Sequence, residues 1–197
     1  MKKETRLLDV ELRTPETEDD KMIVEGYAIT FNSPATHGYT EVINEHALDD
    51  KDMSDVPLKY NHEDSHLIMA RTRNKSLELT KDEKGLYIKA ELIDTQSNKD
   101  IYKSIKAGLI DKMSFAFTVR GDEYDYDSDT RTITDIEKLY DVSVVDIPFY
   151  DSTSVYARAE NDEFLSRREE LRKEHEAEEA RKKALAEAKE RILARLG

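Results

Sequence analysis

The 197-residue sequence predicts an α+β fold, with a mostly antiparallel, β-barrel-like core, few helices and a long charged C-terminal helix. Three observations support this prediction. Several segments alternate apolar and polar side chains with period 2, which is typical of strands. Apart from one short turn of helix, only one internal segment reads as a helix, so the alternating βα pattern of a parallel sheet is missing. Residues 160–196 contain neither Gly nor Pro and are rich in Ala, Glu, Lys and Arg, which favours one long helix.

The first half of the chain predicts strands separated by polar turns. In order, we expect a strand over 8–12, a turn over 14–21, a strand over 22–31, a brief strand over 39–42, a short helix over 43–48 and a strand over 56–60. Gly26 suggests a bulge or a close backbone approach within its strand. Pro57 cannot donate a backbone hydrogen bond, so it predicts a strand start or a sheet edge.

The second half predicts a hairpin, a helix and two long strands. In order, we expect strands at 77–79 and 86–93, a helix over 98–107, a strand over 112–119, an acidic loop over 121–130 and a strand over 131–146 with a break near 137–138. Gly85 is expected to supply the left-handed position of the hairpin turn. Asp94 and Thr95 provide an N-cap region for the helix, and Gly108 provides its C-terminal stop.

Composition excludes several classes of function. The formal net charge is −13, and from residue 160 onward there are eleven acids and ten bases, so the preceding body has 33 acids against 21 bases. Phosphate backbones repel such an acidic body, and we expect no nucleic-acid partner. The absence of cysteine excludes disulfides, thiolate metal sites and a cysteine nucleophile. No apolar run approaches the roughly 20 residues of a membrane span, so we expect a soluble, intracellular protein without a membrane partner.

The strand over 112–119 contains a candidate nucleophile. Its large apolar side chains are predicted to face the core, whereas Ser114 shares the opposite face with the small side chains of Ala116 and Thr118. A serine on a rigid strand with small neighbours is expected to have an exposed hydroxyl, as a nucleophile requires. An ordinary surface serine on a strand is the commoner alternative.

The segment from His62 to His66 reads His-Glu-Asp-Ser-His and matches the H-E-x-x-H pattern of zinc proteases. In those enzymes both histidines lie on one face of a helix, and the glutamate (here Glu63) activates a metal-bound water. Pro57 and the turn-forming residues of the motif favour a strand followed by a turn instead. His62 alone, just past a strand end, is a candidate general base. A surface histidine is the third interpretation.

A candidate orienting acid lies in the segment LYDVSVV at 139–145. A carboxylate flanked by valines on a strand needs a partner if it is buried, so Asp141 is a candidate to orient an imidazole. A sheet-edge charge facing water is the alternative, and Ser143 is a rival nucleophile on the same face. Plain hairpin register about the 121–130 loop pairs Ser114 with about residue 137. Asp141 would then lie about 13 Å further along, unless a bulge or His62 bridges the distance.

Short segments follow the order of one known family: GYAITF (26–31), EVI (41–43) with AL (47–48), VPLKYNHE (56–63), KGL (84–86), AGLI (107–110) with MSFAF (113–117), and DVSVV (141–145) with Pro148. Over about residues 5–158 the chain thus resembles the prohead (capsid maturation) proteases of tailed bacteriophages, which are similar in fold to herpesvirus assemblin. The resemblance implies a serine protease with Ser114 as nucleophile, His62 as general base and Asp141 as orienting acid. The family more often has glutamate at the third position.

The resemblance also implies organisation and partners. It implies a protease domain over 1–158 and a charged helical tail over 159–197 that is self-cleaved or contacts the scaffold. The implied function is processing of the major capsid protein with its scaffolding segment, and of the enzyme itself, inside assembling proheads in the host cytoplasm. No cofactor is implied. A solvated tail helix and a partner-binding or self-associating one, which would give a homo-oligomer, both remain open.

Two alternative functions remain. One is a zinc metallopeptidase that uses His62, Glu63 and His66. The other is a non-catalytic module that binds capsid or scaffold.

Overall fold

A computed structural model of the chain describes residues 3–8, 12–15, 21–36, 39–64, 68–146 and 155–196. The chain divides into two compact units, Met1–Ser154 and Val155–Gly197. The described part of the first unit has two β-sheets, one α-helix and a short 3-10 helix, and that of the second is a single long helix. The α+β class and the long charged C-terminal helix are therefore confirmed. The β-barrel expectation is corrected, because the described strands form two separate sheets that do not close.

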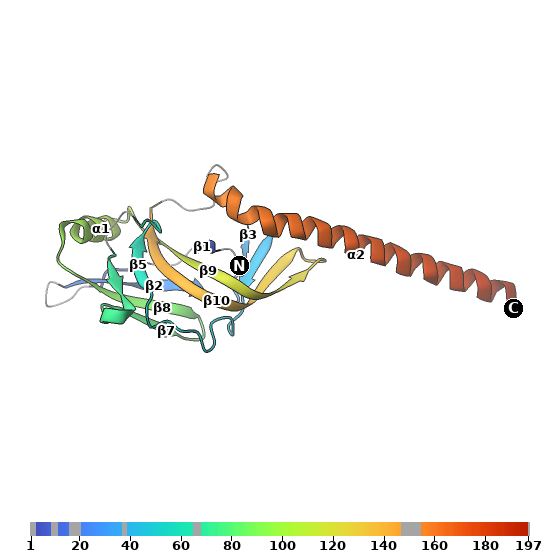
Figure 1. Ribbon diagram of the computed structural model, residues 1–197, viewed down its shortest axis with the longest axis horizontal. Coiled ribbons are helices and arrows are strands. Elements are labelled where there is room, and N and C mark those ends of the chain that lie inside the picture. Colours follow the sequence, from blue (N-terminus) through green and yellow to red (C-terminus); the bar gives the residue numbers. More distant parts are fainter. Residues whose placement is uncertain are drawn as a thin grey trace. The chain divides into compact units, whose positions relative to one another are not determined.

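The larger sheet contains seven of the described strands: β1 (Glu4–Leu8), β3 (Ala35–Thr36), β4 (Thr40–Ile43), β5 (Pro57–Tyr60), β6 (Ala70–Arg71), β9 (Lys112–Asp125) and β10 (Thr130–Val145). Their order is β1-β9-β10-β4-β3, with β5 beside β10 and β6 beside β5. The long β9–β10 hairpin, yellow to orange, dominates this sheet (Figure 1). Strand β10 pairs in parallel with β4 near its start and with β5 near its end, and the other pairs are antiparallel.

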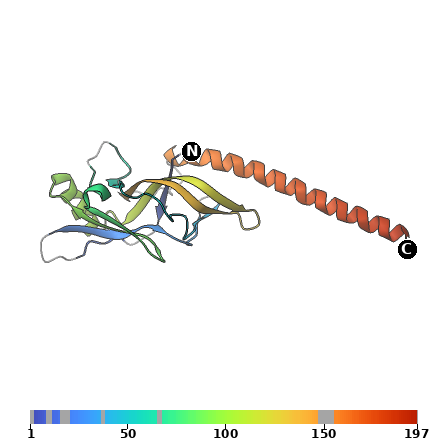
Figure 2. The ribbon, with the colours of Figure 1, turned by 60° about the horizontal axis from the view of Figure 1, so that its bottom comes forward.

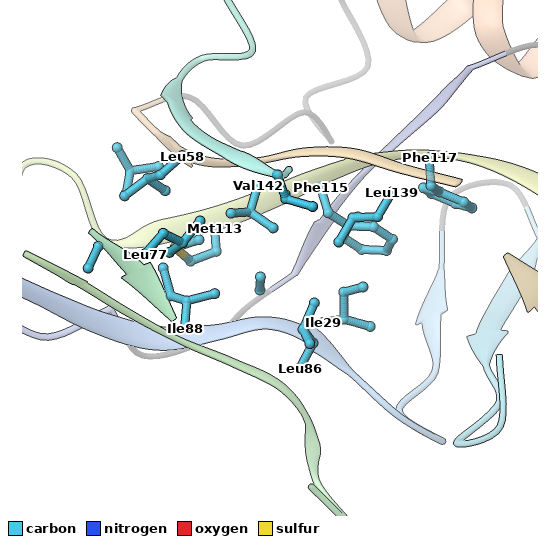
Figure 3. Close-up of a cluster of buried hydrophobic side chains, with 14 of the residues drawn as sticks. Ile29, Leu58, Leu77, Leu86, Ile88, Met113, Phe115, Phe117, Leu139 and Val142 are labelled. Atoms are coloured by element: carbon cyan, nitrogen blue, oxygen red, sulfur yellow. The ribbon is translucent and has the colours of Figure 1, made fainter. Parts of the chain in front are cut away.

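The smaller sheet has the order β2-β8-β7, formed by β2 (Met22–Thr30), β8 (Gly85–Leu92) and β7 (Leu77–Lys81). It lies in a second layer, with β2 in blue opposite the yellow β9 (Figure 2). The hydrophobic core fills the space between the layers (Figure 3), and its labelled members are Ile29, Leu58, Leu77, Leu86, Ile88, Met113, Phe115, Phe117, Leu139 and Val142. The side chains predicted to face inward from the strand over 112–119 thus do so. The opposite face of that strand belongs to the candidate site.

Helix α1 (Gln96–Lys106) follows the smaller sheet. The Thr95 side chain accepts a hydrogen bond from the backbone N–H of Asn98, so the predicted N-cap is confirmed. Gly108 follows the helix with φ of 71°, a conformation that favours glycine and ends the helix. The 3-10 helix spans Thr72–Asn74.

Two local predictions are wrong. Residues 45–50 form turns rather than a helix, because the Asn44 side chain accepts the backbone N–H of His46 and competes with helical bonding. Gly85 is not in a left-handed conformation. It is required for another reason, since a Cβ at this position would lie 1.9 Å from the backbone oxygen of Ile29. The strands β2 and β8 therefore approach too closely there for any side chain.

The acidic tract also differs from its prediction as a loop. Strand β9 continues to Asp125 and β10 begins at Thr130, so only residues 126–129 form the turn. The register then shifts at several points along the hairpin, including one between Ile136 and Lys138, where the break was expected. As a result Ser114 pairs with Ser143, six residues beyond the position that plain register about a 121–130 loop gave.

The second unit consists of helix α2 (Val155–Leu196), which begins five residues earlier than the sequence suggested. Most of its described side chains are exposed, and charged pairs such as Lys182 with Glu178 and Glu179 lie along it. Propensity and i,i+4 pairing, rather than a wide apolar face, thus favour this helix. No helix of the described part of the chain is both long and apolar enough to cross a bilayer.

Candidate active site

Ser114 lies near the start of β9, between β1 and β10. Its Oγ lies 2.6 Å from Nε2 of His62 and 2.8 Å from the backbone oxygen of Arg6, and its hydroxyl can donate to either. The residue is only 2% exposed, so the expectation of an exposed hydroxyl is wrong. The neighbours Ala116 and Thr118 are too small to cover it, but β1 and the imidazole do so from outside β9.

His62 follows the end of β5 in a tight turn. Asn61 and His62 both have positive φ, of 52° and 57°, a region that residues other than glycine rarely adopt. Hydrogen bonds to β10 and to the residue that follows it hold this turn. The backbone N–H of Asn61 donates to the backbone oxygen of Val144, and the side-chain amide of Asn61 donates to the carboxylate of Asp146. The turn directs the imidazole back over the sheet toward Ser114.

Asp141 lies on β10, opposite Ala116 and two residues before Ser143. Its side chain is 1% exposed, so it is not a sheet-edge charge facing water. One carboxylate oxygen accepts a hydrogen bond from Nδ1 of His62, and the other lies 3.1 Å from Nζ of Lys3. Burial by itself raises the pKa of Asp141. The hydrogen bond from His62 and the nearby positive charge of Lys3 outweigh burial, so the net effect is a lowered pKa.

The expected 13 Å separation between the hydroxyl and the carboxylate therefore does not arise. The short turn at 126–129 and the register shifts bring Asp141 to the same end of the hairpin as Ser114. His62 bridges the two from β5, the parallel neighbour of β10. An alcohol, an imidazole and a carboxylate thus stand in one hydrogen-bonded series.

The zinc motif does not adopt the geometry that a zinc protease requires. His62 lies in a turn, Glu63 is exposed and follows it in non-helical backbone, and both ring nitrogens of His62 contact Ser114 or Asp141. His66 lies outside the described residues. Among the residues that are described, no group of three His, Asp or Glu side chains is placed to hold a metal ion.

A buried cluster of charges anchors β1 beside the site. Arg6 and Arg131 share the carboxylates of Glu4 and Glu41, and the two arginines and Glu41 are each under 10% exposed. Tyr39 donates to Glu41 as well. Burial lowers the pKa of Arg6, but the charge of Glu41 and its hydrogen bond outweigh this and raise it, so the pair is ionised. The cluster ties β1 to β4 and β10 and so fixes the Arg6 carbonyl against Ser114.

Sequence reasoning missed the contributions of Lys3 and of the Arg6 carbonyl. Nothing in the sequence marked either one, because Lys3 is one of many lysines and a backbone carbonyl has no sequence signal. The Arg6 contact matters chemically, since the hydroxyl of Ser114 has one proton. That proton points either to the Arg6 carbonyl or to Nε2 of His62, and base catalysis requires the second orientation.

A hydroxyl, an imidazole and a carboxylate in hydrogen-bonded series define the constellation of serine hydrolases, here built on an α+β fold. The family model described as caudovirus prohead serine protease matches residues 8–167. The chain belongs to this family.

Individual proteins are similar to it as well. The prohead protease of Enterobacteria phage HK97 is 28% identical over 139 residues, which are 68% of this chain and 59% of that protein. The chain therefore spans less than two thirds of the length of that relative. The structure of the bacteriophage T4 capsid assembly protease aligns with a TM-score of 0.46 at 13% identity, over 72% of this chain and 98% of that one.

Proposed function

We propose that this chain is a serine endopeptidase in which Ser114 is the nucleophile, His62 the general base and Asp141 the orienting acid. The observation that carries the proposal is the position of the His62 ring, with Nε2 at 2.6 Å from Ser114 Oγ and Nδ1 on the Asp141 carboxylate. Membership of the prohead serine protease family supports it. The carboxylate requires the proton on Nδ1, which leaves Nε2 free to act as a base.

The reaction follows from these positions. His62 Nε2 takes the proton of Ser114 as Oγ attacks a peptide carbonyl, and then gives it to the leaving amine. Water, activated by the same nitrogen, releases the acyl group and restores the serine. Asp141 stabilises the transient imidazolium. Base catalysis of this kind contributes about 10²- to 10⁴-fold in rate. The buried carboxylate and the strand-bound serine are held in place, which lowers the reorganisation that each step requires.

The proposed substrates are proteins of the assembling prohead. The HK97 relative is itself a prohead protease, and by that similarity we assign to this chain the major capsid protein, its scaffolding segment and the chain itself as substrates. The place of action is then the interior of the prohead in the host cytoplasm. We further propose a protease domain over 1–158 and a tail over 159–197 that contacts scaffold or is removed. The exposed, charged surface of α2 supports a role in contact with other proteins.

Co-expression with the capsid precursor tests the proposal. The wild-type chain is expected to shorten the precursor on a gel, and Ser114→Ala is expected to leave it intact. Ser128→Ala, in the exposed hairpin turn, is the matched control and should cleave normally. A chelator should not change cleavage. Cleavage by Ser114→Ala would rule out the serine mechanism, whereas a wild-type chain that binds the precursor without cutting it would favour a non-catalytic module.

A further inference from the structure

Ser143 occupies the middle of the site without a role in the mechanism above. It lies on β10, where it pairs with Ser114 of β9 on one side and with Lys59 of β5 on the other. Its side chain has no exposed surface. A hydroxyl buried to this degree must have hydrogen-bond partners, and those partners indicate what it does.

The hydroxyl of Ser143 joins the turn after β5 to the carboxylate of Asp141 on its own strand, β10. Its Oγ accepts the backbone N–H of His62 at 3.2 Å and donates to Oδ1 of Asp141 at 3.1 Å. The same oxygen lies 3.1 Å from Nδ1 of the His62 ring. One side chain therefore contacts the main chain of the candidate base, its ring and the carboxylate that orients it.

These contacts exclude Ser143 as the nucleophile. The two nitrogens of an imidazole point in diverging directions, and Ser143 is on the Nδ1 side, where Asp141 accepts the hydrogen bond from Nδ1–H. Ser114 is on the Nε2 side, where a base can pass a proton onward. Ser143, which the sequence offered as an alternative nucleophile, thus lies where proton transfer to a substrate cannot occur.

We infer that Ser143 is a positioning residue that holds His62 in its catalytic orientation, an inference that rests on the proposed function. The turn at Asn61 and His62 has two consecutive residues of positive φ, which persist only where neighbouring contacts hold them. The bond from His62 N–H to Ser143 is one of those contacts. The bond from Ser143 to Asp141 fixes the carboxylate that receives Nδ1–H. Without the Ser143 hydroxyl, the His62 ring still has Asp141 and Ser114 beside it, but it is no longer held in alignment with Ser114.

An alkyl fluorophosphonate tests this role, because Ser114 Oγ displaces fluoride from phosphorus while His62 takes the proton. The labelling rate gives a maximal rate constant, kinact, and a half-saturating concentration, KI. We expect Ser143→Ala to lower kinact about 10- to 100-fold, the size of effect that misplacement of a reacting group by 1 Å produces. KI should not change, because Ser143 does not touch the probe.

Ser143→Thr and Ser143→Val provide a matched pair of equal shape that differs only in the hydroxyl. Threonine is expected to retain much more of kinact than valine. If alanine leaves kinact at the wild-type value, if threonine and valine lose it equally, or if the label maps to Ser143, the inference is overturned. Ser114→Ala separates this from the proposed function. Labelling that survives Ser114→Ala contradicts the serine mechanism itself, whereas labelling that requires Ser114 but ignores Ser143→Ala contradicts the positioning role alone.

Discussion

Removal of the Glu41 charge is expected to destabilise the first unit strongly. Glu41 accepts hydrogen bonds from Arg6 at 2.8 Å, from Arg131 at 3.1 Å and from Tyr39 at 3.2 Å, and its side chain is 3% exposed. Glu41→Gln keeps the shape of the side chain but leaves two buried guanidinium groups with one carboxylate fewer. Loss of one partner of a buried ion pair costs about 3–5 kcal/mol.

For a domain of this size each kcal/mol corresponds to about 2–4 °C, so the midpoint of thermal unfolding should fall by roughly 6–20 °C. Calorimetry is the suitable assay, because the chain contains no tryptophan to report on its core. Glu45→Gln is the matched control, since Glu45 is nearby in sequence and about half exposed. A Glu41→Gln midpoint that equals that of Glu45→Gln would refute the reasoning that the charge cluster anchors β1.

Three further outcomes follow from the geometry. Asp141→Asn should lower the cleavage rate roughly 10³- to 10⁴-fold, because an amide at this position no longer requires the Nδ1–H tautomer of His62; retention of the wild-type rate would exclude an orienting role. Because the pKa of Asp141 is lowered in the folded protein, its ionised carboxylate stabilises the fold above about pH 4. This stabilisation is lost as the pH falls through the folded pKa. Lys3→Met reduces that shift, so urea titrations should show a loss of less than about 1 kcal/mol at neutral pH that disappears in acid, with Lys3→Arg as control. Gly85→Ala should cost about 1–3 kcal/mol in the same assay, because its Cβ would meet the oxygen of Ile29; wild-type stability would show that the strands can separate freely there.

Periodicity predicted the elements whose signals are local. The alternation around Phe115 identified β9, Thr95 and Gly108 marked the ends of α1, and the uninterrupted charged tract identified α2. Each of these signals acts within a few residues of the element that it specifies. The order of short motifs, through the resemblance to the prohead proteases, also selected Ser114, His62 and Asp141 as candidate site residues.

Long-range features could not be predicted in the same way. The pairing of Ser114 with Ser143 depends on where the β9–β10 turn falls and on each register shift along the hairpin. The composition of the acidic tract around Gly121 favoured a loop. In the structure Gly121 belongs to β9, because it pairs with Asp135 of β10. The burial of Ser114 depends on β1, which is more than one hundred residues away in sequence. Such tertiary pairings decide burial and register, and no local pattern encodes them.

Mapping the covalent adduct of a fluorophosphonate by peptide mass spectrometry tests the central claim most directly. The mechanism predicts a single modified residue, Ser114, in the wild-type chain and no adduct there when His62 is replaced by alanine. An adduct at another serine, or equal labelling of Ser114 without the His62 imidazole, would contradict the account.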